Sequence, residues 1–290
     1  MAIRLTLIAD YACHTGEGPL WHPDEQALYW VDIPRGRLFR YHPGSGRHEP
    51  VLEVREAIGG FTIQANGDLL LFMAQGRIAL WREGRSLQTV IDQIPEEVEG
   101  RFNDVIADPE GRVFCGTMPI RDRPGKLYRL DPDGSLHTVL EDAGLSNGMG
   151  FTADLGTFYH SDSWRRTIRA FDYDRATGTL SNPRLLVAET DPARGIPDGM
   201  AVDAGNCLWS ARWDGHCLVH HMPDGRELQR IPFPVPKVSS ITFGGPDYTE
   251  MYVTTAGGHH KEQEGPLAGG LFRLNLGIQG KPPFRSRIQA

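Results

Sequence analysis

A turn followed by a short apolar segment recurs six times along the chain, and this repeat limits the possible fold more than any other feature. Turns such as Asn66-Gly67 and Glu110-Gly111 precede β-type runs, here residues 69–73 and 113–117. A further strand-like segment follows each run, and polar turns with a short fourth strand complete several units. Four short strands in each of six units, spaced about 42 to 51 residues apart, are typical of an all-β, six-bladed β-propeller.

The ends of the repeat and the turn-forming residues fit this fold. The 290 residues include 34 glycines and 21 prolines, which favour turns over helices. Residues 4–8 precede the first repeat, and we expect them to form the outer strand of the last blade, which closes the ring without a free sheet edge. No linker interrupts the repeat, so residues 1–290 are predicted to form a single propeller domain.

Charge and hydropathy exclude several classes of partner. The chain has 30 basic and 37 acidic residues, a net charge of −7, and its basic residues are scattered. Nucleic-acid binding would require a basic stripe, and a membrane span would require roughly 18 consecutive apolar residues. The N-terminal residues do not resemble a signal peptide. We therefore expect a cytoplasmic protein that acts on a small molecule, and the oligomeric state stays open.

The four cysteines do not have the spacing of a zinc site or of a redox pair. Asp214-Gly215 is a strong hairpin signal, and a turn there places Arg212 opposite Cys217. This register leaves Cys207 and Cys217 out of phase for a disulfide. We therefore expect free thiols.

The innermost strand of each propeller blade lines the central channel, so equivalent positions in different blades converge on one axis. Counting seven residues back from each turn aligns these strands at Glu17, Gly59, Asn103, Asn147, Asp198 and Ser240. Four of the six positions carry a carboxylate or amide oxygen, although Asp, Asn and Glu are poor strand formers. A polar network that caps the strand ends with water is one explanation for such a set.

A metal site is the other explanation, and the chemistry of the set favours it. Two carboxylates gathered on one axis repel each other unless they are neutralised. Carboxylate and amide oxygens without thiolate or imidazole suit Ca²⁺ above all, and also Mg²⁺ or Mn²⁺, while Zn²⁺ and Fe²⁺ remain possible. The sequence therefore predicts a central channel that binds one divalent metal ion.

Six motifs follow one another at blade spacing: Gly16-Glu17-Gly18-Pro19-Leu20-Trp21, Arg101-Phe102-Asn103-Asp104, Cys115-Gly116-Thr117-Met118, Ser146-Asn147-Gly148, Pro197-Asp198-Gly199-Met200 and Phe243-Gly244-Gly245-Pro246-Asp247. This ordered series resembles the SMP-30/gluconolactonase family, which includes regucalcin and sugar lactonases. The resemblance implies a propeller with one metal ion held by Glu17, Asn147 and Asp198, and substrate contacts from Arg101 and Asn103. In related propeller hydrolases the matching asparagine is itself a ligand, so either role is open for Asn103. The implied reaction is hydrolysis of a sugar-acid lactone to the free acid.

One segment departs from the family pattern. Animal members carry a substrate-contacting acidic residue a few positions after their Gly-Thr-Met, whereas here Arg121 falls near that position. We therefore expect Arg121 to contact substrate and to favour a more anionic lactone, derived from a uronic or aldaric acid.

Several mechanisms and functions remain open at this stage. Asp198 is the best candidate for the general base, but it could instead only hold the metal while a metal-bound hydroxide attacks. Arg101 could bind substrate or stabilise the oxyanion. The sequence lacks Gly-x-Ser-x-Gly, which excludes an α/β-hydrolase nucleophile elbow. A promiscuous esterase or organophosphate hydrolase, and a non-catalytic calcium-binding regulatory protein, are the alternatives to a lactonase.

Overall fold

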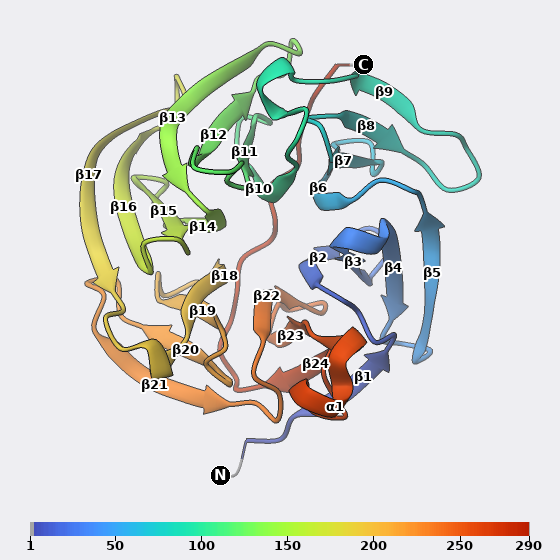
Figure 1. The fold of residues 1–290 in the computed structure, drawn as a ribbon, viewed down its shortest axis with the longest axis vertical. Helices are drawn as coiled ribbons and strands as arrows, with labels where there is room; N and C mark the ends of the chain where they lie inside the picture. The colour runs from blue at the N-terminus through green and yellow to red at the C-terminus, as the bar shows by residue number, and fades with distance from the viewer. Residues whose placement is uncertain (1–2, 290) are drawn as a thin grey trace.

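The computed structural model describes residues 3–289. Within this range the chain forms six four-stranded antiparallel sheets, arranged as blades around a common axis (Figure 1). The six-bladed β-propeller predicted from the repeat is confirmed.

Consecutive strands of each blade run from the axis outwards. Blades 1 to 3 comprise β2 (Gly16–His22), β3 (Ala27–Asp32), β4 (Arg37–His42) and β5 (Arg47–Glu53); β6 (Ile58–Ile63), β7 (Leu69–Met73), β8 (Ile78–Trp81) and β9 (Gln88–Ile91); and β10 (Phe102–Ala107), β11 (Val113–Thr117), β12 (Gly125–Leu130) and β13 (Leu136–Gly144). Blades 4 to 6 comprise β14 (Ser146–Phe151), β15 (Thr157–Asp162), β16 (Thr167–Asp174) and β17 (Thr179–Ala188); β18 (Ile196–Val202), β19 (Leu208–Trp213), β20 (Cys217–His221) and β21 (Glu227–Pro232); and β22 (Val238–Gly244), β23 (Glu250–Thr255), β24 (Gly270–Asn275) and β1 (Thr6–Asp10).

The ring closes as expected from the sequence. Strand β1 pairs antiparallel with β24, with Thr6 opposite Arg273 and Asp10 opposite Gly270. The outer strand of blade 6 therefore comes from the N-terminal end of the chain, although it starts two residues later than the predicted segment. This pairing joins the two ends of the repeat.

Apolar side chains fill the spaces between neighbouring blades. One such cluster joins blades 3 and 4 through Phe114, Phe151, Phe158 and Tyr173, whose rings pack edge-on or tilted. The inner and middle strands are buried on both faces, while outer strands such as β17 are largely exposed. This burial explains why second strands such as β7 read as continuous apolar runs.

Helical segments are short and lie in the connections. They are η1 (Ile33–Arg35), η2 (Pro95–Glu97), η3 (Pro192–Arg194), η4 (Gly258–His260) and α1 (Lys261–Glu264). No helix within the described part of the chain is long and apolar enough to cross a membrane.

The cysteines behave as the hairpin register predicted. Arg212 lies opposite Cys217 across β19 and β20, and Cys13, Cys115, Cys207 and Cys217 are all free.

The segment after β24 crosses the ring near its axis, as Figure 1 shows. It hydrogen-bonds to three blades in turn: Ala204 donates to the carbonyl of Gln279 at 2.9 Å, Lys281 to that of Phe151 at 2.5 Å, and Ser286 to that of Ile63 at 2.9 Å. Residues 281–284 line one side of a cavity of about 180 Å³ inside the ring. Nothing in the repeat predicted this segment, because its partners are remote in sequence.

Candidate active site

The structure brings four of the predicted site residues together at the start of the inner strands. Glu17 lies on β2, Asn103 on β10, Asn147 on β14 and Asp198 on β18, and each side chain is at least nine-tenths buried. All four strands have an irregular register at this point, for example between Glu17 and Leu20 and between Ser146 and Met149. Such bulges redirect side chains out of the regular strand alternation.

Glycines next to these residues allow the inner strands to approach each other closely. A Cβ at Gly148 would lie 2.3 Å from the backbone nitrogen of Met200, and one at Gly199 would lie 2.1 Å from Oγ of Ser240. Both contacts are too short for any other residue. The Asn-Gly and Asp-Gly pairs in the motifs therefore follow from the packing of the strands around the axis.

Asn147 links two blades and has one unused acceptor. Its Nδ2 donates to Oδ1 of Asp198 and, at 3.0 Å, to Oγ of Ser163, which in turn donates to the carbonyl of Pro197 at 2.6 Å. Its Oδ1 is buried and has no hydrogen-bond partner among the described residues. Leaving a buried acceptor unpaired costs about 1–3 kcal/mol, so this oxygen indicates a ligand.

The carboxylates at the site lie close enough together for the charge of one to change the pKa of another. Burial, followed by the neighbouring charges of Asp198 and Asp104, raises the pKa of Glu17 well above its usual value. Burial, followed by the charge of Asp104, raises the pKa of Asp198 in the same way. Glu17 accepts a hydrogen bond from the backbone of Gly18 at 2.9 Å, which offsets part of this effect. A group of buried acids with raised pKa values is the environment that a cation stabilises.

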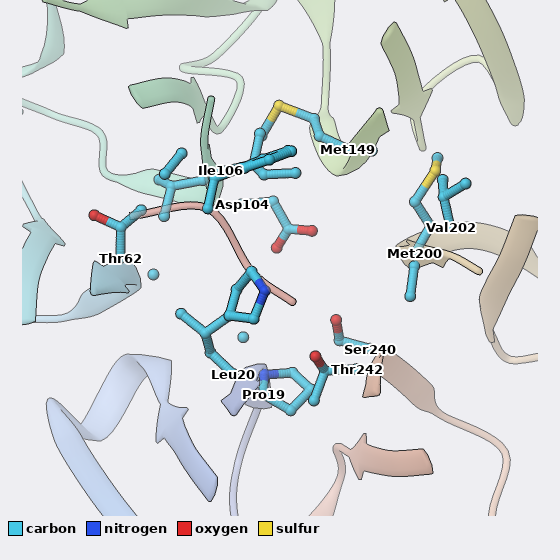
Figure 2. Close-up of a pocket in the computed structure, with 18 of the residues that line it drawn as sticks. Pro19, Leu20, Thr62, Asp104, Ile106, Met149, Met200, Val202, Ser240 and Thr242 are labelled. Atoms are coloured by element: carbon cyan, nitrogen blue, oxygen red, sulfur yellow. The ribbon is translucent and has the colours of Figure 1, made fainter. Parts of the chain in front are cut away.

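Asp104 is a further acidic residue at this site that the sequence analysis did not select. Burial raises its pKa to about 7. In Figure 2 it lies among apolar side chains of the cavity such as Leu20, Ile106 and Met149. Regular strand alternation would turn Asp104 away from Asn103, but the register of β10 shifts between Phe102 and Val105. The sequence signal that could have identified Asp104 as a site residue was its position directly after Asn103 in the motif.

The cavity extends the site along the axis. Its lining residues on these four inner strands begin one or two positions after the site residues, at 18–20, 104–107, 149–151 and 200–202. The site therefore lies at the start of the inner strands, and the segment at 281–284 borders the space further along them.

Arg101 and Asn103 form a unit of their own. Nη1 of Arg101 donates to Oδ1 of Asn103 and to the carbonyl of Phe102, both at 2.8 Å. Nδ2 of Asn103 donates to the carbonyl of Ser146 at 2.9 Å. Burial lowers the pKa of Arg101, and the acids of the site oppose this shift. In contrast to Asn147, Asn103 has its side-chain oxygen occupied.

Arg121 is not brought together with these residues. It lies in the connection between β11 and β12 with a positive φ of 54°, and its side chain is 79% exposed. Its Nη2 donates to Oε1 of Glu99 at 3.0 Å. Met118 in the same connection hydrogen-bonds to the carbonyl of Arg101, so Arg121 lies on a loop that adjoins the site.

The donor set at the channel fits a divalent cation. Glu17 and Asp198 supply carboxylate oxygens that are disfavoured as free charges, and Asn147 supplies an unpartnered amide oxygen. All three are oxygen donors, which suit hard cations such as Ca²⁺.

The chain is thus a six-bladed β-propeller whose polar site, formed by buried acidic and amide side chains, lies at the centre of the ring. Residues 15–257 match the family model described as "SMP-30/Gluconolactonase/LRE-like region", and the chain belongs to this family. The family expected from the motifs is thus confirmed.

Individual relatives agree with this assignment. The chain is 47% identical to pentonolactonase XacC of Haloferax volcanii over 99% of both chains, and 35% identical to regucalcin of Gallus gallus over 98% of both. It also resembles the solved structure of a luciferin-regenerating enzyme, with a TM-score of 0.90, 26% identity and coverage of 99% of this chain and 100% of the other. The family and its named relatives support the expectation of a lactonase enzyme.

Proposed function

We propose that the protein is a metal-dependent lactonase that opens the lactones of sugar acids to the free acids. The observation that carries this proposal is the unpartnered Oδ1 of Asn147 beside two buried, coupled carboxylates. A purely structural network would satisfy that oxygen within the protein.

Glu17, Asn147 and Asp198 would hold the metal ion. When bound, the ion would supply Lewis-acid polarisation of the lactone carbonyl and a lowered pKa for a coordinated water. The oxygen-only donor set favours Ca²⁺, and it also admits Mg²⁺, Mn²⁺, Zn²⁺ or Fe²⁺.

Asp198 would act as the general base. Its Oδ1 accepts the hydrogen bond from Asn147, which fixes the orientation of the carboxylate. A carboxylate that lies beside both the metal ion and the attacking water can accept the proton of that water. The attacking water would transfer its proton to Asp198 as the carbonyl carbon is attacked.

Arg101 would bind the substrate and stabilise the charge that develops on the lactone oxygen. Asn103 positions it, because the Oδ1 of Asn103 accepts from Nη1 of Arg101. This engaged oxygen favours a substrate-side role for Asn103 over a role as metal ligand. A guanidinium that is fixed in place and partly shielded from water stabilises developing negative charge more strongly than one free in water.

The substrate class follows from the relatives and from one loop. A protein named pentonolactonase is 47% identical over nearly the full length, so the lactones of five-carbon sugar acids are the first substrates to test. We propose in addition that Arg121 favours lactones that carry a second, anionic group.

The decisive experiment measures proton release on adding sugar lactones to protein that has been stripped with a chelator and reloaded with one metal at a time. The panel contains five- and six-carbon aldonolactones and a uronic-acid-derived lactone, and Asp198→Asn is the control. We expect metal-dependent acceleration that the control lacks. Turnover of aryl esters or organophosphates alone would indicate the promiscuous hydrolase instead. Tight Ca²⁺ binding without any lactone turnover above the spontaneous rate would indicate the regulatory protein.

A further inference from the structure

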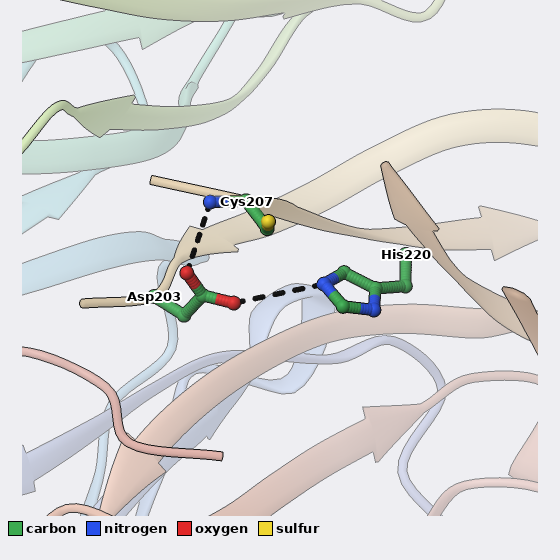
Figure 3. A group of neighbouring side chains, drawn as sticks. All are labelled: Asp203, Cys207 and His220. Carbon is green, nitrogen blue, oxygen red and sulfur yellow. Dashed lines mark hydrogen bonds and ion pairs between the residues drawn. The ribbon is translucent and has the colours of Figure 1, made fainter. Parts of the chain in front are cut away.

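A second cluster of potential metal ligands lies in blade 5, on different side chains from those of the channel site. Asp203 follows β18, Cys207 ends the turn that leads to β19, and His220 lies on β20 (Figure 3). A carboxylate oxygen of Asp203, Sγ of Cys207 and a ring nitrogen of His220 all lie within 4.8 Å of one another.

His220 has an unsatisfied nitrogen that faces this cluster. The residue is 9% exposed, and its Nε2 has no hydrogen-bond partner among the residues that the structure describes. This nitrogen lies 3.6 Å from Oδ2 of Asp203, beyond hydrogen-bond distance, and the two form an ion pair only when the histidine is protonated. The ring stacks on Trp209 with centroids 3.9 Å apart and planes 15° apart, which fixes its orientation. A buried nitrogen without a partner is costly, and a cation would remove this cost.

Asp203 is a preorganised anionic ligand. Its Oδ1 accepts from the backbones of Gly205 and Cys207, both at 2.9 Å, and its Oδ2 accepts from Nε1 of Trp209 at 3.0 Å. These three hydrogen bonds hold the carboxylate in one orientation, and Oδ2 retains a second lone pair.

Blade 3 contains the same turn, but there an arginine side chain neutralises the aspartate. Asp108 accepts from the backbones of Glu110 and Arg112, as Asp203 does from the residues at the same spacing. In blade 3, however, the side chain of Arg112 donates to Oδ2 of Asp108 at 2.9 Å and neutralises it. The position of Arg112, four residues after the aspartate, is occupied by Cys207 in blade 5. In blade 5 the positively charged side chain of Arg112 is thus replaced by the thiol of Cys207.

Lys281 lies near Asp203, but it does not pair with this aspartate as Arg112 pairs with Asp108 in blade 3. The charge of Lys281 is close enough to Asp203 to affect the pKa of the lysine. Its Nζ, however, donates to the carbonyl of Phe151, and within residues 3–289 the one charged partner recorded for Asp203 is His220, at 3.6 Å.

We propose that Asp203, Cys207 and His220 form a second metal site that binds Zn²⁺ or a similar borderline cation such as Co²⁺. A carboxylate, a thiolate and an imidazole are the donors that Zn²⁺ prefers, whereas Ca²⁺ requires oxygen ligands. Bond lengths of about 2.0–2.3 Å place the ligand atoms of a tetrahedral site about 3.3–3.7 Å apart, which agrees with the distance of 3.6 Å between Asp203 and His220. Water would complete the coordination.

A metal ion bound at this site would link the turn after β18 to β20 through its ligands, and this link would stabilise blade 5. The thiol of Cys207 loses its proton to solvent as its sulfur binds the cation, because only the thiolate is a ligand. No electron transfer is involved, and the cation keeps its charge.

The test is a titration of the purified, metal-free protein with Co²⁺, followed by its absorption in the near ultraviolet. A sulfur-to-cobalt charge-transfer band requires a thiolate ligand, and the proposed channel ligands contain no sulfur. We expect a band that saturates at one Co²⁺ per chain and persists in Asp198→Asn. Added Zn²⁺ should abolish it by competition.

Matched variants identify the residues that give rise to the charge-transfer band. Cys207→Ser should lose it, while Cys217→Ser, which changes another cysteine of the same blade, should retain it. His220→Phe keeps an aromatic ring against Trp209 but removes both nitrogens, so the band should appear only at cobalt concentrations at least about tenfold higher. A wild-type titration without a charge-transfer band would overturn the proposal, as would a band of full intensity in Cys207→Ser. Zinc-dependent thermal unfolding gives a second measurement when both proteins also carry Asp198→Asn, which removes a channel ligand. In that background, zinc should raise the Tm far more with His220 present than with His220→Phe.

Discussion

The side-chain amide of Asn147 donates to the carboxylate of Asp198, and this contact joins the inner strands of the neighbouring blades 4 and 5. The same nitrogen also donates to Ser163. Both hydrogens are therefore used, and the oxygen of Asn147 remains as a buried acceptor without a partner in residues 3–289. An asparagine held in this way presents its oxygen in one orientation, which is what a ligand of a fixed metal site requires.

The buried carboxylates should reduce the stability of the metal-free protein. Glu17 and Asp198 have raised pKa values because they are buried and close to other acids. In chelator at pH 7, Glu17→Gln and Asp198→Asn should therefore increase the free energy of unfolding by about 1–2 kcal/mol. Urea unfolding of each variant beside the wild type measures this.

Adding the metal should reverse the order of stability. The wild type gains stability from binding, whereas the two variants bind weakly and lose lactone turnover. Calorimetric titration and proton release provide the two readouts. Metal binding and turnover at the wild-type level in either variant would refute the assignment of these ligands.

Arg101 should contribute mainly to turnover. Arg101→Ala should lower kcat/KM by about 100-fold, the usual effect of removing one group that stabilises developing charge. Arg101→Lys retains the charge but loses the planar guanidinium that contacts Asn103, so its kcat/KM should lie between those of the wild type and the alanine variant.

The control for Arg101 is Arg226→Ala, which removes an exposed arginine paired with Asp224. Its kinetics should equal those of the wild type. An unchanged kcat/KM in Arg101→Ala would contradict the proposed role.

Arg121 should influence which lactone is preferred, and only modestly. Its side chain is exposed and paired with Glu99, so solvent and salt screen its charge. In Arg121→Ala the ratio of kcat/KM for acidic over neutral lactones should fall by up to about fivefold, the effect of about 1 kcal/mol. Glu99→Gln should raise the same ratio, because it removes the competing acid. Equal ratios in all three proteins would show that Arg121 does not select substrate.

Acid should destabilise the fold partly through His160. Burial lowers the pKa of His160 to about 3, and its Nε2 hydrogen-bonds to Oγ of Ser146 at 2.9 Å. The unfolded state has the ordinary histidine pKa near 6.5 and binds a proton first as the pH falls. The stability contributed by neutral His160 is therefore complete above about pH 6.5 and is lost as the pH falls towards 3.

A comparison of the wild type with His160→Gln isolates this effect. The difference in their free energies of unfolding should change by about 1.4 kcal/mol per pH unit between pH 6 and pH 4, with the wild type losing stability faster. Parallel pH profiles for the wild type and His160→Gln would contradict the prediction.

The repeat alone determined the propeller, its closure by the N-terminal strand, and the positions Glu17, Asn103, Asn147 and Asp198. Each blade is a local antiparallel sheet with the same turn signals, so the strands and their register follow from short-range patterns. Residues at one register of an inner strand must meet on the axis of any closed ring. Counting along the sequence was therefore sufficient to find them.

Tertiary structure decided the features that depend on irregular strands or on partners far apart in the chain. Asp104 joins the site because β10 departs from regular alternation, and Ser163 orients Asn147 from a connection outside the inner strands. Arg121 lies on an exposed loop paired with Glu99, and residues 281–284 border the cavity through contacts with distant blades. His220 faces Asp203 only because β20 folds back beside the turn after β18. A repeat specifies what recurs in every blade, whereas bulges, loops and long-range contacts are particular to one blade and depend on the packing of the whole ring.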